Sequence, residues 1–200
     1  MPQGIFIAGT GTDVGKSYTS AFFLSFLKST KAKLLYYKPI QCGLPSDVTF
    51  IKKKIKHKYT ASSYNLKTPS SPHFALIKEK VKFEKKTIKN FLTQAKKQYD
   101  FIVVEGAGGV RVPITYNFDM ADLAKLSGFP VLLVTYPGLG TINHTLLSID
   151  YLKSKNIKIL GFIFSWAKGV DFNGEMFLDA AKTIEQISGV QFCGAVPKLN

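Results

Sequence analysis

A glycine-rich segment near the start of the chain has the composition of a phosphate-binding loop. A short apolar run at 4–8 comes before it, and a helical pattern follows it. The segment reads Gly9-Thr10-Gly11-Thr12-Asp13-Val14-Gly15-Lys16-Ser17. Glycines let the backbone wrap closely around an anion, and the amides at the start of a helix point toward that anion. The order of strand, loop and helix therefore predicts that this segment binds phosphate groups.

The last two residues of the loop have side chains suited to a nucleoside triphosphate and its metal ion. Lys16 brings positive charge to the β- and γ-phosphates, and the hydroxyl of Ser17 can ligate Mg²⁺. The usual pattern has glycine five positions before Gly15, where this chain has Thr10. A glycine-rich turn without a ligand is the alternative, and the flanking strand and helix argue against it.

A magnesium ion beside such a loop needs a carboxylate, usually at the end of a neighbouring buried strand. Glu105 follows the apolar run 101–104 and precedes the small residues 106–109, which let the backbone approach a ligand. A strand-end glutamate that meets only solvent is the alternative. Asp47 is a weaker second candidate, since as the N-cap of the following helix it would need no ligand.

Lys38 is a candidate for a second cation in the site. It ends a predicted strand at 33–37 and precedes Pro39. Its side chain should emerge at the carboxyl edge of the sheet, where ligands of α/β proteins bind. An ordinary exposed lysine is the alternative, because the chain has many lysines.

The elements that must position these residues alternate along the chain. We predict strands at 4–8, 33–37, 101–104, 131–135, 159–164 and 191–195, and helices at 16–27, 85–97, 142–153 and 174–187. Several strands are apolar without alternation, which is typical of a sheet covered on both faces. The fold class is therefore α/β, a three-layer sandwich with a central, mostly parallel sheet of the P-loop NTPase type. We expect a helix followed by an irregular excursion at 46–80, where periodicity is weak.

Length and composition favour a single domain over residues 1–200, since 46% of the residues are hydrophobic. The net charge of +14 would suit a nucleic acid or a membrane surface, but Arg111 is the only arginine. Arginine is the residue favoured for base and bidentate phosphate contacts, so we expect a solvated lysine surface and no nucleic acid or membrane partner. The first residues lack the features of a signal peptide, and Cys42 and Cys193 have no metal-ligand spacing. We expect a cytoplasmic protein.

The motifs together resemble those of dethiobiotin synthetases. The matching segments are Gly9-Thr10-x-Thr12-x-Val14-Gly15-Lys16-Ser17, Tyr37-Lys38-Pro39, Glu105-Gly106-Ala107-Gly108-Gly109 and Gly140-Thr141-Ile142-Asn143-His144. The resemblance implies ATP-dependent closure of a ureido ring on 7,8-diaminononanoate with CO₂, giving dethiobiotin, ADP and phosphate in biotin biosynthesis. A carbamate and a carbamic-phosphoric anhydride are the implied intermediates.

The resemblance also implies roles for residues. Lys16, Lys38 and Thr12 would be catalytic, and Mg²⁺ would be held by Ser17, Asp47 and Glu105. The other nucleotide-binding residues would be Asp13, Val14, Gly15, Gly106, Ala107, Gly108, Val196, Pro197 and Lys198. The substrate would meet Thr12, Lys38 and Cys42 of one subunit and Gly140, Thr141 and Asn143 of the other, which implies a homodimer. Cys42 replaces the family's usual serine, and a thiol is the weaker hydrogen-bond partner.

A departure from the family concerns the nucleotide base. Ser165 and Trp166 stand where relatives usually have asparagine and aspartate, the asparagine reading the adenine edge. A hydroxyl lacks the paired donor and acceptor of an amide, so we expect GTP or CTP to serve beside ATP. Stacking of Trp166 on adenine is the alternative.

Two other classes of P-loop protein are alternative hypotheses for the function. Amide synthetases of the cobyrinate type also activate small carboxylates, but they usually carry a glutaminase domain. Partitioning or switch ATPases typically place a second lysine early in the loop, and residues 9–14 contain none.

Overall fold

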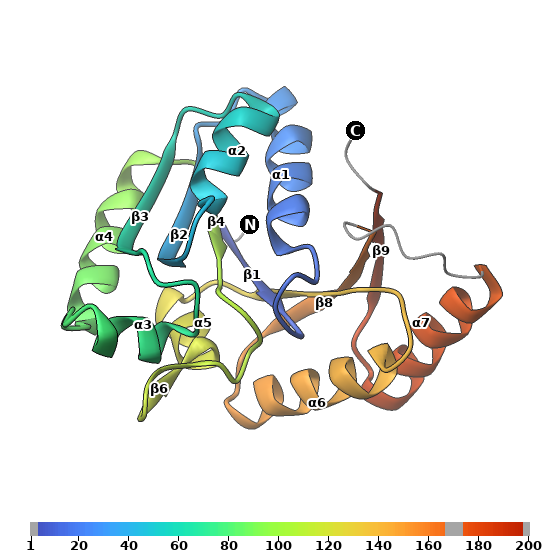
Figure 1. The fold of residues 1–200 in the computed structure, drawn as a ribbon. Helices are drawn as coiled ribbons and strands as arrows, with labels where there is room; N and C mark the ends of the chain where they lie inside the picture. The colour runs from blue at the N-terminus through green and yellow to red at the C-terminus, as the bar shows by residue number, and fades with distance from the viewer. Residues whose placement is uncertain (1–3, 167–173, 198–200) are drawn as a thin grey trace.

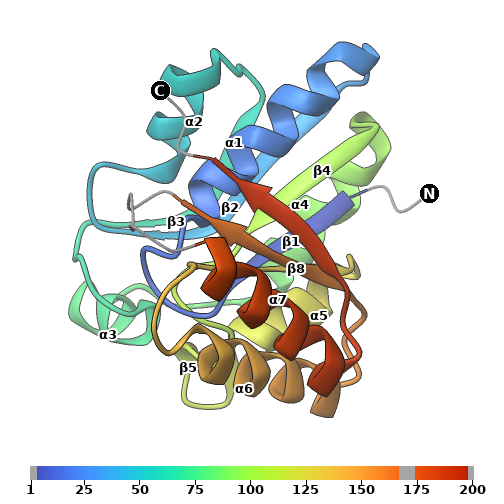
Figure 2. The ribbon, with the colours of Figure 1, turned by 90° about the vertical axis from the view of Figure 1, so that its right-hand side faces the viewer.

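The computed structural model describes residues 4–166 and 174–197, and a parallel sheet lies at its centre between two layers of helices (Figures 1 and 2). The sheet has seven strands in the order β3-β2-β4-β1-β7-β8-β9, and each neighbouring pair is parallel. The strands are β1 Gly4–Gly9, β2 Leu34–Cys42, β3 Thr60–Leu66, β4 Phe101–Glu105, β7 Val131–Thr135, β8 Ile159–Ser165 and β9 Phe192–Val196. The predicted three-layer α/β sandwich is confirmed.

Helices cover both faces of the sheet, and each face has its own apolar core. On one face lie α1 (Lys16–Leu27), its short 3₁₀ extension η1 (Lys28–Thr30) and α2 (Asp47–Ile55). The other face is covered by α3 (Pro72–Lys78), α4 (Lys85–Gln98), α5 (Met120–Ser127), α6 (Thr141–Ser154) and α7 (Gly174–Ser188). Successive residues of β1 divide between the cores: Ile7 packs toward α1, and Phe6 belongs to the opposite core. Burial on both faces explains why the central strands are apolar without alternation.

The segment 46–80 differs from the sequence prediction. It contains α2, then β3 as an edge strand parallel to β2, and then α3, so the predicted irregular excursion is wrong. In β3 only Tyr64 and Leu66 are buried. An edge strand with so few buried side chains has almost no apolar pattern, which is why the sequence did not indicate it.

Strand β2 extends beyond the predicted end at 37 to Cys42. Its ladder with β4 stops at Tyr37, while its pairing with β3 continues from Ile40 to Cys42. Pro39 has no N–H to donate, and it lies where β4 no longer pairs with β2. The proline is therefore accommodated inside the strand.

A two-stranded antiparallel hairpin, β5 (Pro113–Thr115) and β6 (Phe118–Asp119), follows the loop after β4. The carboxyl ends of β1, β2 and β4, which are neighbours in the sheet, meet at one edge. The loops that leave these ends supply the candidate site. Among the described residues, no helix has both the length and the apolar character needed to span a bilayer.

Candidate active site

The glycine-rich loop connects β1 to α1 as the sequence predicted. Gly15 precedes α1 with φ 97°, a left-handed conformation that favours glycine. At Gly9 a Cβ atom would lie 3.0 Å from the carbonyl oxygen of Gly11 and from the side chain of Lys16. Lys16 folds back over the loop, where its Nζ donates to the Gly11 carbonyl at 2.8 Å. The backbone of the loop therefore lies in close contact with the Lys16 side chain.

Three oxygen-bearing side chains converge beside the loop. The Ser17 Oγ lies 2.9 Å from Asp47 Oδ1 and 2.8 Å from Glu105 Oε1. A hydroxyl has one proton, so it can satisfy only one of these carboxylates at a time. Hydroxyl and carboxylate oxygens are the ligands that a hard divalent cation prefers. The residues predicted to hold Mg²⁺ are therefore brought together with fitting chemistry.

Two residues that sequence reasoning missed hold the Glu105 carboxylate in place by hydrogen bonds. Its Oε2 accepts hydrogen bonds from Ser20 Oγ at 2.6 Å and from the Tyr36 hydroxyl at 3.0 Å. Burial, with the nearby Glu105 charge, raises the pKa of Tyr36 well above its ordinary value, so the phenol stays protonated as a donor. This arrangement turns Oε1 toward Ser17 and Lys38. Their positions could have been inferred from sequence spacing. Ser20 follows Lys16 by one helical turn, and Tyr36 lies two residues before Lys38 on the same face of the strand.

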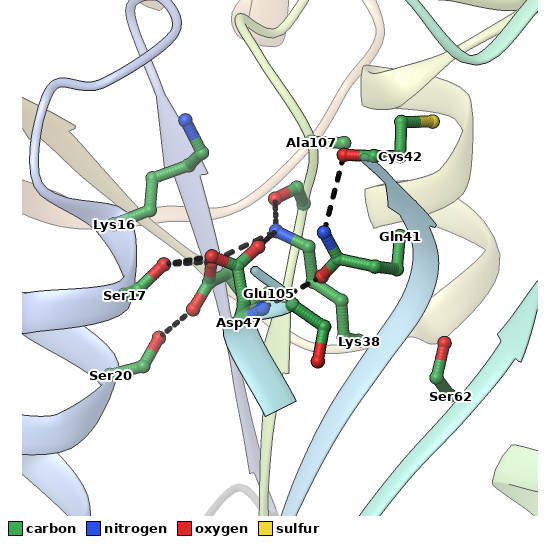
Figure 3. Close-up of polar contacts among 12 residues, drawn as sticks. Lys16, Ser17, Ser20, Lys38, Gln41, Cys42, Asp47, Ser62, Glu105 and Ala107 are labelled. Atoms are coloured by element: carbon green, nitrogen blue, oxygen red, sulfur yellow. Dashed lines mark hydrogen bonds and ion pairs between the residues drawn. The ribbon is translucent and has the colours of Figure 1, made fainter. Parts of the chain in front are cut away.

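Lys38 lies between the two carboxylates (Figure 3). Its Nζ is 2.7 Å from Asp47 Oδ2 and 2.9 Å from Glu105 Oε1, and it donates to the Gly106 carbonyl at 2.8 Å. The residue is only 3% exposed, so the alternative of an ordinary surface lysine is wrong. Burial lowers the pKa of Lys38, but Glu105 and Asp47 outweigh it and raise the pKa overall. The side chain is a buried ammonium ion.

Lys16 is in a different electrostatic environment. Burial, and then the positive charge of Lys38, lower the pKa of Lys16 to about 8. Figure 3 shows its amino group pointing away from the carboxylates that surround Lys38. The two lysines thus differ in the charge that surrounds them.

Asp47 occupies the first turn of α2, and it is not the N-cap. The cap is Ser46, whose Oγ accepts from the Thr49 amide at 3.1 Å, so the capping alternative for Asp47 is wrong. Gln41, another residue that sequence reasoning missed, accepts from the Asp47 amide at 2.9 Å through its Oε1. Its Nε2 donates to the carbonyls of Cys42 and Gly43 at 3.3 Å each. Gln41 thereby fastens α2 to the end of β2.

These groups open onto one cleft of about 780 Å³. The predicted site residues that line it are Thr12, Asp13, Gly15, Lys16, Ser17, Lys38, Cys42, Asp47, Glu105, Ala107 and Gly108. The segment 69–72 before α3 forms part of its wall. Burial raises the pKa of the Cys42 thiol to about 11, although Lys38 acts in the opposite direction. The cleft thus combines cations, carboxylates, exposed backbone and a neutral thiol.

Proteins similar to this chain over nearly its whole length are found among the dethiobiotin synthetases. A profile of the AAA domain family matches residues 3–200. The chain is 35% identical over 195 residues to the ATP-dependent dethiobiotin synthetase BioD of Methanococcus vannielii, covering 96% of this chain and 92% of the relative. It is 36% identical over 200 residues to the enzyme of the same name from Methanocaldococcus jannaschii, with the same coverage. The chain belongs to the dethiobiotin synthetase family.

Solved structures with low sequence identity share the fold of this family member. The cell division ATPase MinD of Pyrococcus furiosus superposes with a TM-score of 0.64 at 17% identity, covering 99% of this chain and 84% of MinD. A ParA family ATPase from Chlorobium tepidum gives a TM-score of 0.61 at 12% identity, covering 98% and 84%. These likenesses confirm the P-loop NTPase-like architecture.

Other residues that the family resemblance singled out lie away from the cleft. Gly140, Thr141 and Asn143 stand at the start of α6, and they do not line the cleft that holds Lys38. Gly140 and Thr141 instead line a separate pocket of about 370 Å³. Within one chain, Gly140 and Thr141 therefore line a different cavity from the residues around Lys38.

The expected base-binding residues of this family member lie at the ends of β8 and β9. Ser165 is 2% exposed and pairs with Val196, and its Oγ lacks a hydrogen-bond partner among the described residues. Trp166 packs against Phe177, with ring centroids 4.9 Å apart. Val196 is buried and Pro197 follows it, while Lys198 lies outside the described residues. Val14 belongs to the core under α1.

Proposed function

We propose that this chain closes a ureido ring on 7,8-diaminononanoate, using CO₂ and ATP and releasing dethiobiotin, ADP and phosphate in biotin biosynthesis. The observation on which this rests most is the convergence of Lys16 and Lys38 on one cleft, with Ser17, Asp47 and Glu105 between them. The relatives' shared name supports the same reaction. Residues 1–200 act as a single domain in the cytoplasm, with no nucleic acid or membrane partner.

The proposed reaction concentrates negative charge at every stage. A carbamate forms on one amine and attacks the γ-phosphorus, which gives a carbamic-phosphoric anhydride and ADP. The second amine then attacks the anhydride carbon and displaces phosphate as the ring closes. Such chemistry depends on positioned cations and amides that stabilise developing charge. Lys16 would hold the β- and γ-phosphates, Lys38 would neutralise the carbamate and γ-phosphate, and Thr12 would contact the substrate.

The oxygens of Ser17, Asp47 and Glu105 are the groups that would hold Mg²⁺. When bound, this ion neutralises charge on the phosphates. The protein's own part is to fix the carboxylates: Gln41 holds the backbone of Asp47, and Ser20 with Tyr36 holds Glu105.

The remaining residues of the proposed ATP site come from three segments of the chain, after β1, after β4 and from the end of β9 onward. It would comprise Asp13, Val14, Gly15, Gly106, Ala107, Gly108, Val196, Pro197 and Lys198. Because Ser165 replaces an amide at the base, we propose that GTP and CTP also serve as co-substrates.

The substrate site is proposed to lie between two subunits of a homodimer. Cys42 of one subunit would face the amines, and Gly140, Thr141 and Asn143 of the partner subunit would bind the carboxylate at a helix start. Within one chain Gly140 and Thr141 line a different pocket from the cleft, which supports this arrangement.

Phosphate release tests the proposal against the rival classes. We expect release from ATP only when the diamine and bicarbonate are both present. Release that needs no diamine and is stimulated by DNA would overturn it in favour of a partitioning or switch ATPase. Release driven by a carboxylate and an ammonia donor would favour the cobyrinate-type amide synthetases.

A further inference from the structure

A cluster of buried threonine hydroxyls connects the phosphate loop to α6. Thr10 opens the loop, Thr135 ends β7, and Thr141 and Thr145 lie in the first two turns of α6. Thr135 is the hub. Its Oγ1 lies 3.2 Å from Thr10 Oγ1, 3.2 Å from Thr145 Oγ1 and 3.1 Å from Thr141 Oγ1. The exposed fractions of Thr135, Thr141 and Thr145 are at most 2%.

The cluster has a defined direction of hydrogen bonding. Thr10 and Thr145 both donate to Thr135, which fills both acceptor positions of the Thr135 hydroxyl. The single proton of Thr135 is then left for Thr141. Thr141 therefore accepts, and among the described residues its own proton has no acceptor in a hydrogen bond. That proton remains for a ligand in the pocket at the start of α6, which Thr141 lines.

Few other hydrogen bonds hold the start of α6. Its N-cap is Gly140, at φ 87°, which offers no side-chain cap, and its first turn contains no acidic residue. The amide of Thr141 donates to the Gly138 carbonyl at 3.0 Å, within the same loop. The hydroxyl cluster attaches this turn to the strand end and to the phosphate loop, while the Tyr136 hydroxyl after β7 donates to the Leu139 carbonyl at 2.9 Å just before the helix. Thr10 itself is anchored to β7 by its amide, which donates to the Val134 carbonyl at 3.0 Å.

We propose that Thr135 is a positioning residue that fixes the first turn of α6 relative to the phosphate loop and orients the Thr141 hydroxyl as a donor to the substrate carboxylate. This inference rests on the proposed function for the identity of the ligand. It also explains the threonine at position 10, where the common phosphate-loop pattern has glycine. Its side chain is the contact from the loop to the hub.

The test replaces the hub hydroxyl without changing its shape. Thr135→Val leaves Thr10 and Thr145 without their acceptor, whereas Thr135→Ser keeps a hydroxyl at the same place. Thr145→Val removes one donor only. Ser148→Ala is the matched control, because that buried hydroxyl on α6 donates to the His144 carbonyl of its own helix and does not join the cluster.

Two readouts are compared, amide hydrogen exchange in α6 and steady-state kinetics. In Thr135→Val we expect faster exchange at the amides of His144 and Thr145. We also expect the KM for the diamine to rise about fivefold or more, the equivalent of one or more buried hydrogen bonds. The change in kcat should stay within about twofold, because binding rather than chemistry is affected. Thr145→Val should show smaller changes in the same direction, and Thr135→Ser and Ser148→Ala should resemble wild type.

The outcomes separate this inference from the proposed function. Unchanged exchange in Thr135→Val, or a Thr135→Ser variant that behaves like Thr135→Val, would overturn the role of the hydroxyl. Faster exchange with an unchanged KM for the diamine would overturn the role in substrate binding. A wild-type protein with no diamine-dependent turnover would refute the proposed function, while the exchange data would still decide the positioning role.

Discussion

Lys38 and Lys16 reach the cleft from different elements and meet different charges. Lys38 is held between Asp47 and Glu105, whereas Lys16 lies over the phosphate loop with its pKa lowered to about 8, chiefly by burial. Each would face charge that develops in the transition state. We predict that Lys38→Ala and Lys16→Ala each lower kcat about 10²-fold or more, the usual scale for one such contact.

The control for both variants is Lys53→Ala, which removes an exposed lysine on α2 and should leave turnover unchanged. Steady-state phosphate release gives kcat for each protein, and circular dichroism checks that each is folded. Wild-type turnover in Lys38→Ala would remove this lysine from the mechanism.

The carboxylate of Glu105 leads to a prediction about metal dependence. Glu105→Gln should raise the Mg²⁺ concentration needed for half-maximal activity while the fold stays intact, because a neutral amide is a poorer ligand for a hard cation. Glu84→Gln, at an exposed glutamate, is the control. A Mg²⁺ titration that superposes on that of wild type would exclude Glu105 from the metal site.

Cys42 provides a prediction with a defined pH dependence. Burial raises the pKa of its thiol from 9.0 to about 11, so the reactive thiolate is scarce at pH 8 and increases as the pH rises toward 11. We predict that iodoacetamide alkylates Cys42 at pH 8 about a hundredfold more slowly than an ordinary thiol, as expected for a shift of this size. The measurement uses Cys193→Ser, in which Cys42 is the remaining cysteine of the chain. Alkylation at the ordinary rate would contradict the neutral thiol.

The site was predictable from the sequence where a residue's neighbours in the chain reveal its role. Lys16 and Ser17 are placed by the loop motif, and Glu105 by the apolar run before it. Gln41 could not be found this way, because its role is a contact with the backbone of another element. Tyr36 resembles any apolar residue of a strand until its hydroxyl is seen on Glu105.

At the scale of elements, strands buried on both faces were found from their composition, whereas of the two edge strands β9 was predicted and β3 was not. Strand β7 is fully buried and its predicted bounds agree with the structure. Strand β3 has intermediate burial over most of its length, so its sequence had no apolar pattern to detect. The hairpin of β5 and β6 is too short for a periodic signal.

The ends of β8 and β9 determine a prediction about the nucleotide. Ser165 has no side-chain amide to read adenine, and its hydroxyl has no partner among the described residues. We predict weak affinity for ATP and appreciable activity with GTP or CTP, measured as kcat/KM for each nucleotide. Ser165→Asn should shift the preference toward ATP. A wild-type preference for ATP beyond about a hundredfold would contradict this reading and favour stacking on Trp166.

At the scale of the whole molecule, the proposed substrate site needs two chains. We predict that Asn143→Ala weakens diamine binding, and that mixing it with Lys38→Ala restores activity at a diamine concentration at which neither variant alone turns over, because a mixed dimer would contain one cleft with both halves intact. Recovery of about a quarter of wild-type activity is expected if subunits exchange at random. Lys38→Ala mixed with Lys16→Ala should show no recovery, because both changes damage the same half. Full activity in a monomeric wild-type protein would rule out the shared site.

The most direct test of ureido ring closure follows the carbon atom itself. The protein is incubated with ATP, Mg²⁺, 7,8-diaminononanoate and ¹³C-labelled bicarbonate, and product mass and phosphate are measured together. We predict that each product molecule contains a single labelled carbon and that phosphate is released in equal amount. Phosphate release without a labelled cyclic product, or a product that lacks the label, would contradict the proposed reaction.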